Sequence, residues 1–187
     1  MTHHDLADMM LPHSDKGDTA ELLQSLLSMQ PSNPYVHYRL GNYYSRKGVT
    51  AEHQQAAVEH YQQAIGISPD FGDAYNGLGL IYVADARKAA DASKKKGASN
   101  PNSGKGSPPP PALDHKALER QHLEAARGVF ESAIDATAKT GVVYYSAMKN
   151  LARVQRDLGN DAAAETLLRE LIRLDQNNSS AYWNLGT

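Results

Sequence analysis

The chain has 187 residues, 41% hydrophobic and 7% aromatic, which is enough apolar material for one packed domain. Its formal net charge of −2 gives no overall attraction to nucleic acid or anionic membranes, so we expect neither as a partner. The absence of cysteine excludes disulfides, thiolate nucleophiles and cysteine-based zinc sites. Because no signal peptide or long apolar span is recognisable, we expect a soluble, cytoplasmic protein.

The first predicted element is a helix over residues 18–29. Leucines recur there at helical spacing, and Pro31 follows the last of the apolar positions. The preceding residues, 1–17, are polar and include several histidines, and we expect them to form a flexible N-terminus.

Two further helices are predicted over residues 34–47 and 51–67. Pro34 opens the first helix and Gly48 closes it, and a Ser-Pro-Asp sequence ends the second. Because the connection between them is short, we expect an antiparallel helical hairpin.

Leu-Gly pairs recur along this helical background, at residues 40–41, 78–79 and 185–186. The first two pairs are 38 residues apart, and Leu151 lies 34 residues before the leucine of the third pair. The chain therefore repeats a unit of about 34 residues, with insertions. A glycine inside a helix costs about 1 kcal/mol relative to alanine. Its presence after each leucine predicts close contact with a neighbouring helix.

The second helix of each predicted hairpin carries residues that suit such contact. An aromatic residue stands between two alanines that are seven residues apart: Ala57, Tyr61 and Ala64, then Ala126, Phe130 and Ala133. The alanines allow close approach, and we expect Tyr61 and Phe130 to fill the space between successive hairpins.

These residues resemble the signature of the tetratricopeptide repeat, in which Leu-Gly, Tyr, Ala, Phe or Tyr, Ala and Pro recur. The first unit is similar through Leu40, Gly41, Tyr44, Ala57, Tyr61, Ala64 and Pro69, and the second through Tyr75, Leu78, Gly79, Tyr82, Ala126, Phe130 and Ala133. A third unit carries Met148, Leu151, Ala152, Gly159, Ala164, Leu168 and Leu171, and a fourth has only its opening, residues 182–186. The resemblance implies an all-α superhelix of antiparallel hairpins over residues 18–187, with about three repeats plus a half repeat.

An insert interrupts the second unit, because Leu78 and Leu151 are 73 residues apart. Small and apolar residues continue on both sides of the insert, so we expect an extended helical hairpin in which residues 83–120 lengthen the repeat. The Lys-, Gly-, Ser- and Pro-rich tip, at about 94–111, has no apolar face to bury, and we expect it to be disordered. Whether the basic tip is a spacer or contacts a partner stays open.

In proteins of the family that this chain resembles, the first helices of the hairpins line a concave groove that holds a peptide or a partner helix. The resemblance assigns seven residues to that groove: Tyr38, Asn42, Asn76, Leu80, Lys149, Arg153 and Trp183. Asparagine side chains pair with a peptide backbone, and Lys149 with Arg153, one helical turn apart, suits a carboxylate. We therefore expect a non-enzymatic scaffold or adaptor that binds a protein or peptide in this groove.

The sequence contains no Gly-rich phosphate loop, metalloprotease motif or nucleophile elbow, so we expect no catalytic residue, no metal site and no cofactor. One alternative is an N-terminal regulatory or substrate-recruiting module of a longer enzyme, such as a glycosyltransferase or a peptidase. The fourth unit stops after its first helix, which leaves an uncovered apolar edge. Either the natural chain continues, or this edge frays or forms a homo-oligomer.

Overall fold

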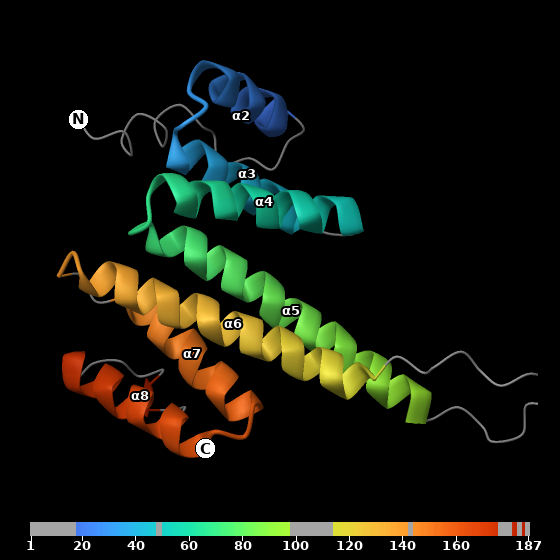
Figure 1. The fold of residues 1–187 in the computed structure, drawn as a ribbon, viewed down its shortest axis with the longest axis vertical. Coiled ribbons are helices and arrows are strands. Elements are labelled where there is room, and N and C mark those ends of the chain that lie inside the picture. Colours follow the sequence, from blue (N-terminus) through green and yellow to red (C-terminus); the bar gives the residue numbers. More distant parts are fainter. Residues whose placement is uncertain are drawn as a thin grey trace, which may run out of the picture.

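The computed structural model describes residues 18–47, 50–97, 114–141, 144–175, 181–182 and 185. Within these residues the secondary structure consists of seven helices, without strands. They are α2 (Asp18–Met29), α3 (Pro34–Lys47), α4 (Ala51–Ile67), α5 (Gly72–Gly97), α6 (His115–Ala138), α7 (Tyr145–Asp157) and α8 (Asp161–Leu174). Figure 1 shows them stacked in chain order, with α2 at one end and α8 at the other.

Three antiparallel hairpins form this stack: α3 with α4, α5 with α6, and α7 with α8. Helix α2 packs on α3 through Leu23, which is buried with Val36 and Leu40. The helices predicted over residues 18–29, 34–47 and 51–67 coincide with α2, α3 and α4. The expectation of an all-α helical repeat superhelix is confirmed.

Side-chain caps fix where several helices begin. The Asn33 Oδ1 atom accepts hydrogen bonds from the backbone N–H groups of Tyr35 and Val36, at 3.0 and 3.4 Å. At the start of α6, Asp114 Oδ1 accepts hydrogen bonds of 3.1 Å from the backbone N–H groups of Lys116 and Ala117. Such caps satisfy N–H groups that have no partner inside the helix.

The second hairpin is much longer than the others. Helix α5 has 26 residues and α6 has 24, and their far ends extend beyond the rest of the stack (Figure 1). Helix α5 continues to Gly97, so the first residues of the predicted tip, 94–97, are helical. The rest of that tip and the predicted flexible N-terminus, 1–17, lie outside the described residues.

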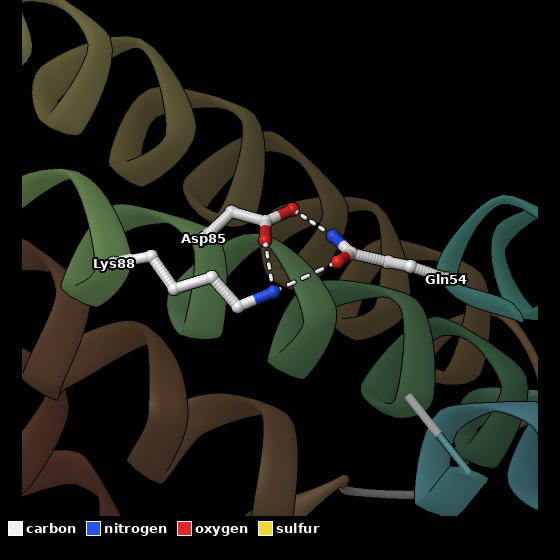
Figure 2. A network of polar contacts seen from close by, with 3 residues as sticks. All are labelled: Gln54, Asp85 and Lys88. Atoms are coloured by element: carbon white, nitrogen blue, oxygen red, sulfur yellow. Dashed lines mark hydrogen bonds and ion pairs between the residues drawn. The ribbon is translucent and has the colours of Figure 1, made fainter. Parts of the chain in front are cut away.

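A polar network holds the start of α4 against α5 at the point where the long hairpin leaves the stack (Figure 2). Lys88 Nζ donates hydrogen bonds to Gln54 Oε1 at 2.8 Å and to Asp85 Oδ1 at 3.1 Å. Gln54 Nε2 donates in turn to the other carboxylate oxygen of Asp85. The network links the first turn of α4 to the middle of α5.

The glycines of the Leu-Gly pairs lie against aromatic rings. A Cβ atom added at Gly41 would lie 2.7 Å from the Tyr61 ring, and one added at Gly79 would lie 2.5 Å from the Phe130 ring. Gly77 also faces Tyr61, at 2.5 Å, so this ring fits between α3 and α5. These positions show the close helix contact expected of Gly41 and Gly79, whereas Gly186 lies outside the described residues.

The described residues of the fourth unit cover part of the last hairpin. Ala181 is fully buried, and Leu185 packs against the apolar cluster that contains Leu168 and Leu171. The Tyr182 side chain is 51% exposed. Self-association through this edge stays a prediction.

In the part of the chain that the structure describes, every helix is too short or too polar to cross a bilayer.

Two histidines form a hydrogen-bonded pair between α3 and α4. His37 Nε2 lies 3.1 Å from the Pro31 carbonyl oxygen, which only accepts hydrogen bonds, so Nε2 carries the proton. His37 Nδ1 is therefore the acceptor for His60 Nδ1–H, 3.1 Å away. The Tyr44 ring stacks on His60 from the other side, at a centroid distance of 5.6 Å.

This pair predicts that the protein loses stability in mild acid. Burial, and then the neighbouring His37, lowers the pKa of His60, while the exposed Glu59 opposes the shift. The stabilisation is therefore complete above the pKa of unfolded histidine, near 6.5, and is lost as the pH falls toward the lowered folded value. We expect urea titrations at pH 7.5 and 5 to show a larger loss of unfolding free energy for the wild type than for His60→Gln. Equal losses would show that His60 does not carry the effect.

Candidate functional site

The first helices of successive hairpins are joined by polar contacts across the stack. Asn150 Nδ2 donates a hydrogen bond of 2.7 Å to Asn76 Oδ1, which connects α7 to α5. Nearer the start of both helices, the Tyr144 hydroxyl donates to Asp73 Oδ1, also at 2.7 Å. These two bonds fix the position of α7 beside α5 and so fix the surface between them.

Two adjoining depressions share Asn150 and Arg153 as lining residues; the smaller lies between α5 and α7, and the larger lies along α7 and reaches α8 at Leu168. The smaller, of about 140 Å³, is lined by Leu80, Val83, Ala84, Arg87, Asn150 and Arg153. The larger, of about 390 Å³, is lined by Lys149, Asn150, Ala152, Arg153, Arg156, Asp157 and Leu168. We call these two depressions together the α5–α7 groove.

The groove combines positive charge with one exposed aliphatic side chain. Its described lining residues include Arg87, Lys149, Arg153 and Arg156, against the single carboxylate of Asp157. The Leu80 side chain is 46% exposed beside them. This arrangement is suited to a ligand with carboxylates and an apolar side chain.

Two opposing effects act on the pKa of Asp157, which lines the groove. Burial raises the pKa of Asp157, whereas the positive charges of Arg87 and Arg156 act to lower it. Asp157 is exposed as a whole residue, but the partial burial of its carboxylate outweighs the effect of the two arginines on its pKa.

The structure places four of the seven predicted binding residues together, at this groove or at its edge. Leu80, Lys149 and Arg153 line it, and Asn76 holds the Asn150 side chain that separates its two parts.

Two predicted residues take part in packing between the first and second hairpins. The Tyr38 ring contacts the rings of Tyr61 and Phe71, at centroid distances of 6.2 and 5.2 Å. The Tyr61 hydroxyl donates a hydrogen bond of 2.7 Å to Asn42 Oδ1. Burial is the main cause that raises the pKa of Tyr61, so the hydroxyl stays protonated as this bond requires. Trp183, the seventh predicted residue, lies outside the described residues.

Sequence reasoning missed Arg87, Arg156 and Asp157 as groove residues. A signal for the arginines was present, because Arg87 lies seven residues after Leu80 and Arg156 lies three residues after Arg153. These spacings place side chains on one helical face. No comparable spacing marks Asp157, whose proximity to Arg87 arises only when α5 and α7 pack together.

The stacked hairpins and the surface between their first helices define an all-α helical repeat protein. A family model described as "TPR repeat" matches residues 53–85, and one described as "Tetratricopeptide repeat" matches residues 117–187. The chain belongs to the tetratricopeptide repeat family, as its resemblance to the repeat signature indicated.

Solved structures with the same fold include IFIT1, as a monomeric mutant with Gppp-AAAA, MamA, and a thermophilic TPR protein of Thermus thermophilus. The IFIT1 match has 21% identity and a TM-score of 0.61, and covers 83% of this chain but only 29% of the length of IFIT1. MamA and the Thermus protein, at 16% and 20% identity, each have a TM-score of 0.57 and cover 90% of this chain and 73% of their own. No curated protein matches the chain significantly.

At these identities the similarity to solved structures shows the fold alone. Tetratricopeptide repeats generally mediate protein–protein interaction and are typically non-catalytic modules.

Proposed function

We propose that this protein is a non-enzymatic scaffold or adaptor of the cytoplasm that binds a peptide or helix of a partner protein in the α5–α7 groove. The observation that carries the proposal is the presence of Lys149, Arg153 and the exposed Leu80 side by side on one surface. Charged groups that surround an apolar contact are the usual means by which an interface selects its partner.

The two hydrogen bonds between α5 and the α7 region support the same proposal. The Asn76–Asn150 and Asp73–Tyr144 hydrogen bonds connect α5 to α7 before any ligand arrives. A preformed surface loses less conformational entropy on binding than a mobile one. The same groove would serve an independent adaptor or a recruitment module within a longer enzyme.

A double charge reversal tests this proposal. We expect Lys149→Glu with Arg153→Glu to lower the recovery of partner proteins from native cell extract by about tenfold, since each reversed contact contributes about 0.7 kcal/mol. Quantitative mass spectrometry after affinity capture measures the recovery. Circular dichroism should show unchanged helicity, because both side chains are exposed.

The matched control is Lys116→Glu with Arg120→Glu on α6. This pair has the same four-residue spacing, the same exposure and the same change in charge, but lies away from the groove. The control should recover the wild-type set of partners. Equal recovery by both double variants would refute a role for Lys149 and Arg153.

RNA is the main competing ligand, because the groove is basic and the IFIT1 structure holds Gppp-AAAA. A titration with that oligonucleotide should show no saturable binding at physiological salt, where nonspecific attraction to a few cations is weak. Saturable binding that Arg153→Glu abolishes would replace the protein partner with RNA.

A further inference from the structure

The smaller depression of the α5–α7 groove has the size of a receptor for one side chain. Its volume of about 140 Å³ is well below the 300–1,000 Å³, roughly, of pockets that enclose whole small molecules. Leu80, Val83 and Ala84 form its apolar side, and Arg87 and Arg153 also line it. An aliphatic side chain would therefore enter with charged groups close on both sides.

The positive charges of the groove favour a partner segment in which acidic residues flank that aliphatic side chain. The whole chain has a formal net charge of −2, yet the described lining residues include four cations and one carboxylate, although one cation, Arg156, also lines the next depression with Asp161 and Glu165. A partner segment gains attraction from this local excess only if it carries acidic residues next to its aliphatic anchor.

Asp157 lies among these positive charges in the free protein. Its carboxylate lies in the larger depression with Arg156, and it interacts electrostatically with Arg87 of the neighbouring helix. In the free protein its negative charge lowers the positive potential that an acidic ligand would meet at these arginines. A ligand carboxylate must therefore compete with Asp157 for the same arginines.

Helix α5 carries the exposed Arg87 between two residues of a polar network. The adjacent residue, Lys88, is bonded to Gln54 and Asp85 on the side of α5 that faces α4 (Figure 2). This network links the turn of α5 that carries Arg87 to α4, so the backbone at Arg87 is supported by the first hairpin.

We propose that the α5–α7 groove recognises an internal acidic segment of a partner protein, with one aliphatic side chain in the depression beside Leu80, and that Asp157 acts as a built-in competitor for the segment's carboxylates. This inference rests on the proposed function, because it names the partner chemistry of the same groove. It requires no free chain end in the ligand.

Fluorescence anisotropy with short labelled peptides tests the proposal on the full chain. Each peptide is blocked at both ends and carries a central leucine flanked by glutamates, by glutamines or by lysines. A fourth peptide has alanine in place of leucine among glutamates, and a fifth has the glutamate sequence with a free C-terminal carboxylate. The proteins are the wild type, Asp157→Asn and Arg153→Glu, with Asp135→Asn on α6 as an exposed control for the loss of one carboxylate.

We expect the blocked glutamate–leucine peptide to bind at least about tenfold more tightly than the glutamine, lysine or alanine versions. Asp157→Asn should strengthen its binding about two- to fivefold, the range that one partly exposed charge contact supplies. Asp135→Asn should leave the affinity unchanged, and Arg153→Glu should weaken binding by at least about threefold. Raising the salt concentration should weaken the complex.

Three results would overturn the inference. If the glutamine peptide binds as well as the glutamate peptide, the groove is not selective for acidic segments, although the proposed function stands. If only the peptide with a free C-terminus binds, the groove recognises a chain end. If Asp157→Asn weakens the binding or leaves it unchanged, Asp157 does not compete. Failure of the proposed function is seen separately, as unchanged partner recovery after reversal of Lys149 and Arg153.

Discussion

Replacing Phe130 with alanine is expected to lower the free energy of unfolding by about 3 to 5 kcal/mol, the usual cost of removing a large aromatic side chain from a core. Phe130 is fully buried, and its ring packs against Gly79 on the facing helix of the same hairpin. It belongs to the apolar cluster that joins this hairpin to Leu151 and Val154 of α7. The variant therefore leaves a cavity at the junction of two repeats. Urea denaturation followed by circular dichroism measures the loss.

Phe71→Ala provides the matched control, because Phe71 is the other phenylalanine of the chain and is only partly buried. It lies between α4 and α5, where it contacts Tyr38. We expect a clearly smaller loss of stability for this variant, since less apolar surface returns to water on unfolding. A loss as large as that of Phe130→Ala would contradict the prediction that Phe130 contributes more to the stability of the core than Phe71.

Gly79→Ala is expected to destabilise the protein by about 1 to 2 kcal/mol, although alanine is the better helix former by about 1 kcal/mol. The added Cβ would lie 2.5 Å from Phe130 Cε1, and this ring is fully buried within an apolar cluster. Overpacking of this kind costs about 1 to 3 kcal/mol, so a cost near the upper end outweighs the gain in helix propensity. The change in urea midpoint, with an unchanged slope, would report the net effect.

Gly128→Ala tests the same substitution at a position where no neighbouring side chain would clash with the added Cβ. Gly128 also lies inside a helix, and no atom outside its own helix backbone lies within 4 Å of an added Cβ. We expect this variant to gain up to about 1 kcal/mol, opposite in sign to Gly79→Ala. In a Phe130→Ala background, Gly79→Ala should become stabilising, because its Cβ then enters the cavity. A loss that persists in that background would show that Phe130 is not the cause.

The tests of the groove depend on a different kind of interaction from these core variants. Lys149, Arg153 and Leu80 are exposed, so their substitution changes what the surface attracts and leaves the packing between hairpins intact. Binding and stability are therefore expected to vary independently. A variant that lost both would indicate that the groove residues also support the fold.

Much of the fold was predictable because its determinants are local. Proline, glycine and the spacing of apolar residues set the bounds of α2, α3 and α4, and the repeated Leu-Gly pairs indicated the stacking. The end of α5 was less predictable. Lys94 to Gly97 lack an apolar face, yet they continue the helix that precedes them, because extending a formed helix costs much less than starting one.

The candidate site was predictable only in part. Helical register placed Lys149 with Arg153, and the structure places Leu80 near them on the adjacent helix. Register alone did not show that Tyr38 and Asn42 contact the Tyr61 side chain, because that contact depends on how α4 and α5 enclose the ring.

The sequence by itself determined which segments are helices, that they pair as hairpins and that small residues face aromatic ones, since these follow from side-chain spacing within helices, the short connections between them and the repetition of the same residues along the chain. Only the tertiary structure decided that Asp157 lies within the field of Arg87, that Asn150 is bonded to Asn76, and that a groove remains between α5 and α7. These features depend on the distance and rotation between helices that are far apart in the chain. Packing of bulky side chains sets that geometry, and no spacing within a single helix encodes it.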